Sequence, residues 1–218
     1  MNSANAISSR LHALASPETA TIQQRFFKTG PGQYGEGDVF LGIKVPTLRA
    51  LAKQHRDAGL ATIGSLLKSR YHEERLFALL LLMQFYEHAA DNERTAAYEL
   101  YLDNTRHINN WDLVDISAPH IVGKHLEKLP RDRLYTLAHS TNLWERRIAI
   151  LATFHFIRQG KFNDTIRIAG ILLHDKHDLM HKAVGWMLRE VGKRDLATLE
   201  AFLQRHYPVM PRTMLRYA

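Results

Sequence analysis

Cysteine is absent from the 218-residue sequence. This absence excludes a disulfide framework, a thiolate metal site and a cysteine nucleophile, and it fits a reducing cytoplasm. Long apolar runs are also lacking, because the longest, Leu76 to Met83, is far shorter than the ~20 residues that a membrane-spanning helix needs. The N-terminus shows no basic stretch followed by an apolar core, so no signal peptide is evident. We therefore expect a soluble cytoplasmic protein with no membrane partner.

Strand signals and cofactor loops are equally scarce. The hairpin dipeptides Asn-Gly and Asp-Gly do not occur, and no glycine-rich loop of the Walker or dinucleotide-binding type is present. We therefore expect no nucleotide and no other cofactor. His174, His177 and His181 are spaced closely enough to suggest a metal site. A turn predicted at 175–178 would separate them, so we favour solvated histidines and expect no metal.

Positive charge is in excess. The chain has 29 Lys and Arg residues against 22 Asp and Glu residues, a formal net charge of +7. Such an excess favours nucleic acid or another polyanion as the partner. A basic surface with no specific partner would give the same count.

Helical periodicity dominates the sequence. Apolar residues recur at helical spacing in segments such as Leu76, Leu79, Leu80 and Met83. The spacing predicts an all-α fold, and the helices are expected near residues 6–14, 17–28, 46–57, 60–70, 73–89, 93–106, 111–127, 131–139, 143–158, 163–174, 178–192 and 196–206.

Four of the long apolar helices recur at a regular interval. Their expected first residues are Glu73, Trp111, Trp144 and Asp178, which are 38, 33 and 34 positions apart. Two helices per interval of this size are typical of HEAT-like repeats. We therefore predict a single repeat domain over 1–218, an α-α superhelix with a concave basic face. An irregular helical bundle is the alternative.

The segment Asn109 to Asp115 combines an indole and a carboxylate. Trp111 and Asp115 are four residues apart, so on a helix they share one face. In a basic protein, this pair suggests a polyanionic substrate with an electron-poor reacting centre. The alternative is a core tryptophan at the start of a helix, with Asp115 paired to an arginine. For Asp112 we expect a role at the helix start.

Two later helices also carry unusual residues. In the first, Trp144 and Ile148 form a core pair, while Arg146 and Arg147 point in different directions. In the second, Trp186 lies between Lys182 and Arg189, and it could be either a core residue or a ligand contact. Gly185 within that helix costs about 1 kcal/mol relative to alanine, which predicts that another segment packs closely against its backbone. Arginines beside aromatic residues make a plausible phosphate track.

Four segments together are similar to one known family. They are Phe40 to Arg49 (FLGIKVPTLR), Asn110 to Asp115 (NWDLVD), Leu143 to Leu151 (LWERRIAIL) and Lys182 to Glu190 (KAVGWMLRE). In order and spacing they resemble the DNA alkylation repair glycosylases of the AlkD type. The resemblance implies a HEAT-like superhelix that hydrolyses the glycosidic bond of alkylated purines such as 3-methyladenine and 7-methylguanine.

The resemblance also implies roles for single residues. Trp111 and Trp186 would be aromatic walls beside the sugar of the damaged nucleotide, and Asp115 the essential carboxylate. Arg147 would contact a phosphate or the sugar, and further DNA contacts are expected from Lys44, Arg146, Lys182 and Arg189. Lys44 stands where the family can have a neutral polar residue, but a lysine also suits a phosphate.

The function predicted from these residues is excision of cationic alkylpurines from double-stranded DNA, in base excision repair. No lysine stands out as a Schiff-base nucleophile, so we expect a monofunctional enzyme. We also expect a monomer associated with the nucleoid, and cleavage with little or no insertion of the base into a pocket. The rival hypotheses are a non-catalytic HEAT-repeat DNA-binding protein and a helical-repeat scaffold for a protein partner.

Overall fold

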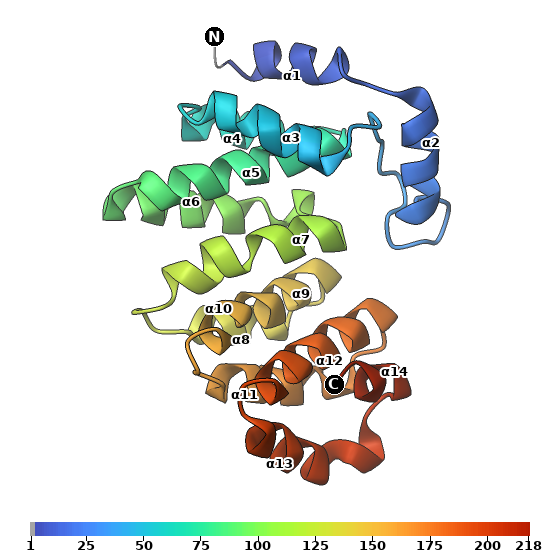
Figure 1. The fold of residues 1–218 in the computed structure, drawn as a ribbon, viewed down its shortest axis with the longest axis vertical. Helices are drawn as coiled ribbons and strands as arrows, with labels where there is room; N and C mark the ends of the chain where they lie inside the picture. Colours follow the sequence, from blue (N-terminus) through green and yellow to red (C-terminus); the bar gives the residue numbers. More distant parts are fainter. Residues whose placement is uncertain (1–2) are drawn as a thin grey trace. The chain divides into compact units, whose positions relative to one another are not determined.

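A computed structural model describes residues 3–218 of the chain (Figure 1). Its regular elements are helices, and within the described residues the β-structure is a single isolated bridge between Val39 and Tyr71. The predicted all-α fold class is therefore confirmed. Backbone contacts divide the chain into two compact units, Met1–Leu113 and Val114–Ala218. The single domain over 1–218 and the concave basic face stay predictions.

The first unit is built around one buried helix, α5 (His72–His88). Its residues from His72 to Leu82 are buried on all sides, including the charged pair Glu73 and Glu74. Helices α3, α4 and α6 pack directly against α5, and α1 packs on α4. The other α-helices that lie wholly within this unit are α1 (Ala4–His12), α2 (Pro17–Phe26), α3 (Val45–Ala52), α4 (Leu60–Leu67) and α6 (Asp91–Asp103). This helix therefore supplies both the core of the unit and a set of buried charges.

The second unit is centred on α12 (Asp178–Gly192), whose start and end match the predicted helix. Helices from both earlier and later in the sequence pack on α12. They are α9 (Leu143–Ala152), α10 (Phe154–Ile157), α11 (Asn163–Ile171), α13 (Leu196–His206) and α14 (Arg212–Tyr217), and α8 (Asp132–Ala138) packs on α9. The prediction did not include α14.

Helix α7 (Trp111–Ser117) is shorter than predicted. The expected helix over 111–127 gives way to a π-helical segment, η3 (Pro119–Gly123). Pro119 has no backbone N–H, so it cannot continue the regular ladder of the helix. Gly123 lies against the next helical layer, since a Cβ atom there would approach the carbonyl oxygen of Ala152 to 2.3 Å.

The local sequence accounts for two further features of the fold. Ser16 caps α2, its hydroxyl accepting from the amide of Thr19 at 3.3 Å, and Pro17 follows as the first helical residue. Trp144 and Ile148 are buried core residues, as their spacing predicted. Among the described helices, none combines the length and the hydropathy required to cross a membrane.

Candidate active site

Asp115 and Arg147 form an ion pair within the second unit. The Nε and Nη2 atoms of Arg147 donate to the two carboxylate oxygens of Asp115, at 2.7 and 2.8 Å. The side chain of Arg147 is 6 % exposed and that of Asp115 is 17 % exposed. A two-pronged contact of this kind fixes the plane of a carboxylate as well as its position. The arginine partner that we weighed as an alternative for Asp115 is therefore present, and the carboxylate is partly exposed.

Arg147 also links this pair to α12. Its Nη1 atom donates to the carbonyl oxygen of Leu179 at 2.6 Å, so three of the five N–H groups of the guanidinium are used. Leu179 is in the first turn of α12, and Arg147 is in α9. The guanidinium of Arg147 thus links Asp115 on α7 to the first turn of α12. The predicted contact of Arg147 with a phosphate or sugar stays a prediction.

Trp186 on α12 is half-buried. This exposure lies between that of a core residue and that of a fully exposed ligand contact, the two interpretations that the sequence left open. Its ring centroid is 5.9 Å from that of Phe154, and the guanidinium of Arg158 lies over Phe154 at 4.2 Å. The neighbouring Gly185 packs closely against α14, because a Cβ atom there would lie 2.4 Å from the carbonyl oxygen of Met214. The predicted close approach at Gly185 is confirmed.

The four predicted DNA contacts differ in their surroundings. Lys44 and Arg189 are exposed. Lys182 forms an ion pair with Asp178 one turn earlier, at 2.7 Å, and both side chains remain accessible. Arg146 is more constrained, since its Nε donates to Asp175 at 2.7 Å. Its Nη1 donates to two carbonyl oxygens that precede α9. Contact of any of the four with DNA stays a prediction.

Trp111 belongs to an aromatic cluster in the first unit. Its ring stacks on Phe27, with centroids 5.4 Å apart and planes inclined by 26°. Phe27 in turn stacks on Phe40 at 5.1 Å, and Phe40 on the imidazole of His72 at 4.4 Å. The indole Nε1 of Trp111 donates to the hydroxyl of Tyr34 at 3.3 Å. Whether Trp111 and Trp186 line one bound nucleotide stays a prediction.

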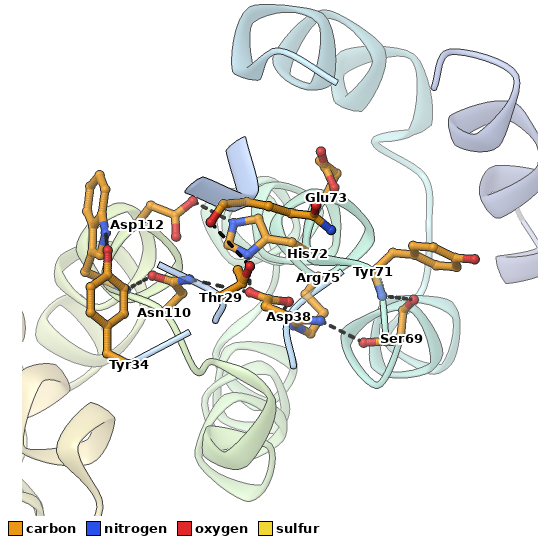
Figure 2. A network of polar contacts seen from close by, with 12 residues as sticks. Thr29, Tyr34, Asp38, Ser69, Tyr71, His72, Glu73, Arg75, Asn110 and Asp112 are labelled. Carbon is orange, nitrogen blue, oxygen red and sulfur yellow. Dashed lines mark hydrogen bonds and ion pairs between the residues drawn. The ribbon is translucent and has the colours of Figure 1, made fainter. Parts of the chain in front are cut away.

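His72 lies between two carboxylates, an arrangement that the sequence analysis missed (Figure 2). Its Nδ1 is 2.8 Å from an oxygen of Asp38, and its Nε2 is 2.8 Å from an oxygen of Asp112. Asp38 also accepts hydrogen bonds from the guanidinium of Arg75 at 2.6 Å and from the side-chain amide of Asn110 at 3.4 Å. These residues are far apart in the sequence, so no local pattern could have announced the network.

Burial and the neighbouring charges shift the pKa values of His72 and Asp38 in opposite directions. Burial alone would lower the pKa of His72, but the neighbouring Asp112 and Asp38 outweigh it and raise this pKa to about 9. Burial would likewise raise the pKa of Asp38. The hydrogen bond from His72 and the charge of Arg75 nevertheless hold it below its ordinary value. His72 is therefore a cation at neutral pH, with both ring nitrogens donating.

The residues Phe40 to Ile43 (FLGI), at the start of the segment Phe40 to Arg49, have a structural role. The buried carboxylate of Glu73 accepts from the backbone amides of Leu41, Gly42 and Ile43, at 2.8, 2.8 and 3.1 Å. Gly42 has a φ of +84°, and a Cβ atom there would lie 2.0 Å from the carbonyl oxygen of Ser16. Glycine is required at this turn on both counts. The segment thereby places the exposed Lys44 just before α3.

Among the described residues, no group of three or more His, Asp or Glu side chains is arranged to hold a metal ion. His177 instead caps α12, its Nδ1 accepting from the amide of Leu179 at 3.2 Å. The ring of His181 contacts the carbonyl oxygen of Asp175.

Comparison with known proteins identifies the family. A sequence profile described as "DNA alkylation repair enzyme" matches residues 7–218. A search of curated proteins finds no match. A solved structure described as "Predicted DNA alkylation repair enzyme from Enterococcus faecalis" is 20% identical in sequence, with a TM-score of 0.72. The similarity covers 93% of this chain and 94% of that chain, and at this identity it shows a shared fold. Because the profile match extends over nearly the whole sequence, the chain belongs to the DNA alkylation repair enzyme family.

Proposed function

We propose that the protein is a monofunctional DNA glycosylase that releases cationic alkylpurines, such as 3-methyladenine and 7-methylguanine, from duplex DNA. One observation carries this proposal: Arg147 holds the carboxylate of Asp115 by both oxygens, and Asp115 lies one helical turn after Trp111 on α7. Membership of the family supports a role in alkylation repair. Cleavage of the glycosidic bond is what the resemblance to AlkD-type glycosylases implies, and the chemistry of these side chains supports it.

The reaction needs an ionised carboxylate that stabilises positive charge on the sugar more than it needs a general acid that protonates the departing base. Alkylation at a ring nitrogen makes the purine cationic, so the base is already a good leaving group. Positive charge then develops on the deoxyribose as the C–N bond breaks, in an oxocarbenium-like transition state. A fixed carboxylate at Asp115 stabilises that charge and can orient the attacking water. Its bond geometry to Arg147 prevents the carboxylate from reorienting during the step.

The indoles complete this environment. The face of a tryptophan ring attracts cations and electron-poor C–H groups, by roughly 0.5–2 kcal/mol per contact. We assign Trp111 and Trp186 to the sugar of the damaged nucleotide. Both are partly exposed, so a ligand can reach them.

Binding of the duplex would depend on the positive surface. The formal charge of +7 favours a polyanion, and Lys44 and Arg189 are exposed cations. We propose that the DNA is held through its backbone, with little or no insertion of the base. Selectivity would then come from the lability of cationic lesions. A complex with modified DNA in which protein fully encloses the damaged base would overturn this part of the proposal.

The test is release of bases from duplex DNA treated with a simple methylating agent, followed by chromatography of the excised bases. The wild type should release 7-methylguanine or 3-methyladenine, and Asp115→Asn should release far less. The product should be an abasic site, without a covalent adduct that borohydride can trap. A wild type that binds the DNA but releases no base would instead support the non-catalytic DNA-binding alternative.

A further inference from the structure

Trp111 is held from several sides within the first unit. Phe27 stacks on the face of its indole, and Phe26 meets the ring edge-on with centroids 6.0 Å apart. The Nε1 atom donates to Tyr34, and the backbone amide donates to the side-chain oxygen of Asn110 at 2.8 Å. The residue is therefore fixed at the ring face, the ring nitrogen and the backbone together.

Tyr34 comes from a glycine-rich loop whose course is tightly determined. Gly32 and Gly37 adopt positive φ angles of 72° and 79°. The amide of Gly35 donates to the carbonyl oxygen of Lys28 at 3.2 Å, and a Cβ atom at Gly35 would lie 2.6 Å from the carbonyl oxygen of Phe27. The loop thus folds back onto the end of α2. It delivers Tyr34 to the edge of the indole and leads directly to Asp38.

The His72 network fixes the other side of the same helix start. Asp112 follows Trp111 in the first turn of α7 and contacts the Nε2 atom of His72. The opposite ring nitrogen of His72 contacts Asp38, which also accepts from Asn110, the residue before Trp111. The side chain of His72 is 2 % exposed and that of Asp38 is 1 % exposed. Figure 2 shows Asn110, Asp38, His72 and Asp112 as one connected set.

We propose that Tyr34 and His72 are positioning residues for Trp111 in the base-release reaction. Tyr34 sets the orientation of the indole through its ring nitrogen. His72 fixes the first turn of α7 by binding Asp38 and Asp112 at once. A ring fixed before the substrate arrives loses no further freedom when the sugar cation forms, so its orientation contributes to the rate of the chemical step. This inference rests on the proposed function for its catalytic part.

The experiment uses the three tryptophans of the chain as probes. A ¹H–¹⁵N spectrum of the full-length protein should show an indole N–H resonance for each, and Trp111→Phe would assign the one that belongs to Trp111. Tyr34→Phe removes only the hydroxyl that accepts from this indole. Tyr135→Phe is the matched control, because the hydroxyl of Tyr135 donates to Asp164 at 2.6 Å in the second unit.

Tyr34→Phe should shift the Trp111 resonance, leave the other two indole resonances in place, and speed exchange of the Trp111 N–H with solvent. It should lower kcat for base release about 10-fold with KM nearly unchanged, whereas Tyr135→Phe should change neither. A Trp111 resonance that does not respond to Tyr34→Phe would overturn the inference, as would a shifted resonance with unchanged kcat.

His72 is tested with two variants of different reach. In His72→Gln the new side chain carries its amide nitrogen near the position of Nε2 and keeps a donor for Asp112. In His72→Asn the shorter side chain keeps a donor only for Asp38. His72→Asn should therefore shift the Trp111 resonance and lower kcat more than His72→Gln.

Equal spectra and rates for the two variants and the wild type would remove His72 from this role. A wild type that releases no base would remove the proposed function, and the spectra would still decide whether Tyr34 and His72 hold the indole.

Discussion

The two units contain buried charge clusters of different chemistry. In the first unit a histidine bridges two carboxylates, and its positive charge is lost as the pH rises through about 9. In the second unit an arginine grips one carboxylate, and a guanidinium stays charged at any physiological pH. The first cluster contacts the first turn of α7 through Asp112, and the second contains the partly exposed carboxylate of Asp115. The charge of His72 therefore changes within an accessible pH range, whereas the charge of Arg147, the partner of Asp115, does not.

The largest effect on stability is expected when only the arginine of the Asp115–Arg147 ion pair is replaced. Arg147→Met removes both bonds to Asp115 and the bond to Leu179, so the free energy of unfolding should fall by about 3–4 kcal/mol. Chemical denaturation measures this change. The double variant Asp115→Asn with Arg147→Met should regain much of the loss, because the negative charge that Arg147 neutralises is removed as well. A double variant as unstable as the single one would show that the pairing is not the cause.

The histidine cluster should make stability depend on pH. The pKa of His72 is raised from 6.5 to about 9, so its protonated form stabilises the folded state. This stabilisation is fully present below pH 6.5 and is lost as the pH rises through about 9. Between pH 6 and pH 9 the free energy of unfolding should fall by roughly 2–3 kcal/mol.

The control for this pH effect is His72→Gln, in which most of the fall should disappear. Titration of Tyr135 does not affect stability between pH 6 and pH 9. Burial and the hydrogen bond to Asp164 raise the pKa of Tyr135 to about 12, so its contribution to stability is lost only above pH 10. A wild type with constant stability from pH 6 to pH 9 would contradict a charged His72.

Two helical glycines of the second unit should respond in opposite directions to alanine. At Gly185 a Cβ atom would collide with the backbone of α14, so Gly185→Ala should destabilise the protein by about 2 kcal/mol. At Gly170 in α11 a Cβ atom would meet nothing within 4 Å. Gly170→Ala should therefore stabilise the protein by about 0.5–1 kcal/mol. Thermal unfolding distinguishes the two, and equal shifts would mean that α14 does not pack as described.

The smallest effects are expected from the exposed cations. Lys44→Ala and Arg189→Ala should each reduce the slope of log affinity against log salt for duplex DNA by about 1, if each contacts one phosphate. Lys44→Arg keeps the charge and should keep the slope. An unchanged slope in Lys44→Ala would exclude a phosphate contact at this position.

Several local features of the fold could be predicted from the sequence. The ends of α12 and α13 match the expected helices, since apolar periodicity and flanking residues agree there. The expected helix over 143–158 is interrupted at Thr153, whose hydroxyl donates to the carbonyl oxygen of Ile150. Such a bond competes with the helical ladder. The short helix α14 was missed because its six residues carry too few apolar positions to show a period.

The candidate site could be predicted only in part. Trp111 and Asp115 stand out because they lie within one helical turn. The interval between Asp115 and Arg147 carries no signal of its own, and their pairing depends on how α7 and α9 pack. The same holds for Asp38, His72 and Asp112, which are separated by 34 and 40 residues. Buried charge networks depend on tertiary packing, and the apolar periodicity of the sequence does not predict them.

The most direct test of the account is the single-turnover rate of 7-methylguanine release from duplex DNA by Asp115→Asn, with the affinity for the same DNA measured separately. This substitution keeps the size of the side chain and removes the charge that would stabilise the sugar cation. The rate should fall about 100-fold, with affinity changed by less than about twofold, because a transition-state interaction is lost. A rate equal to that of the wild type, at equal affinity, would contradict a catalytic role for Asp115.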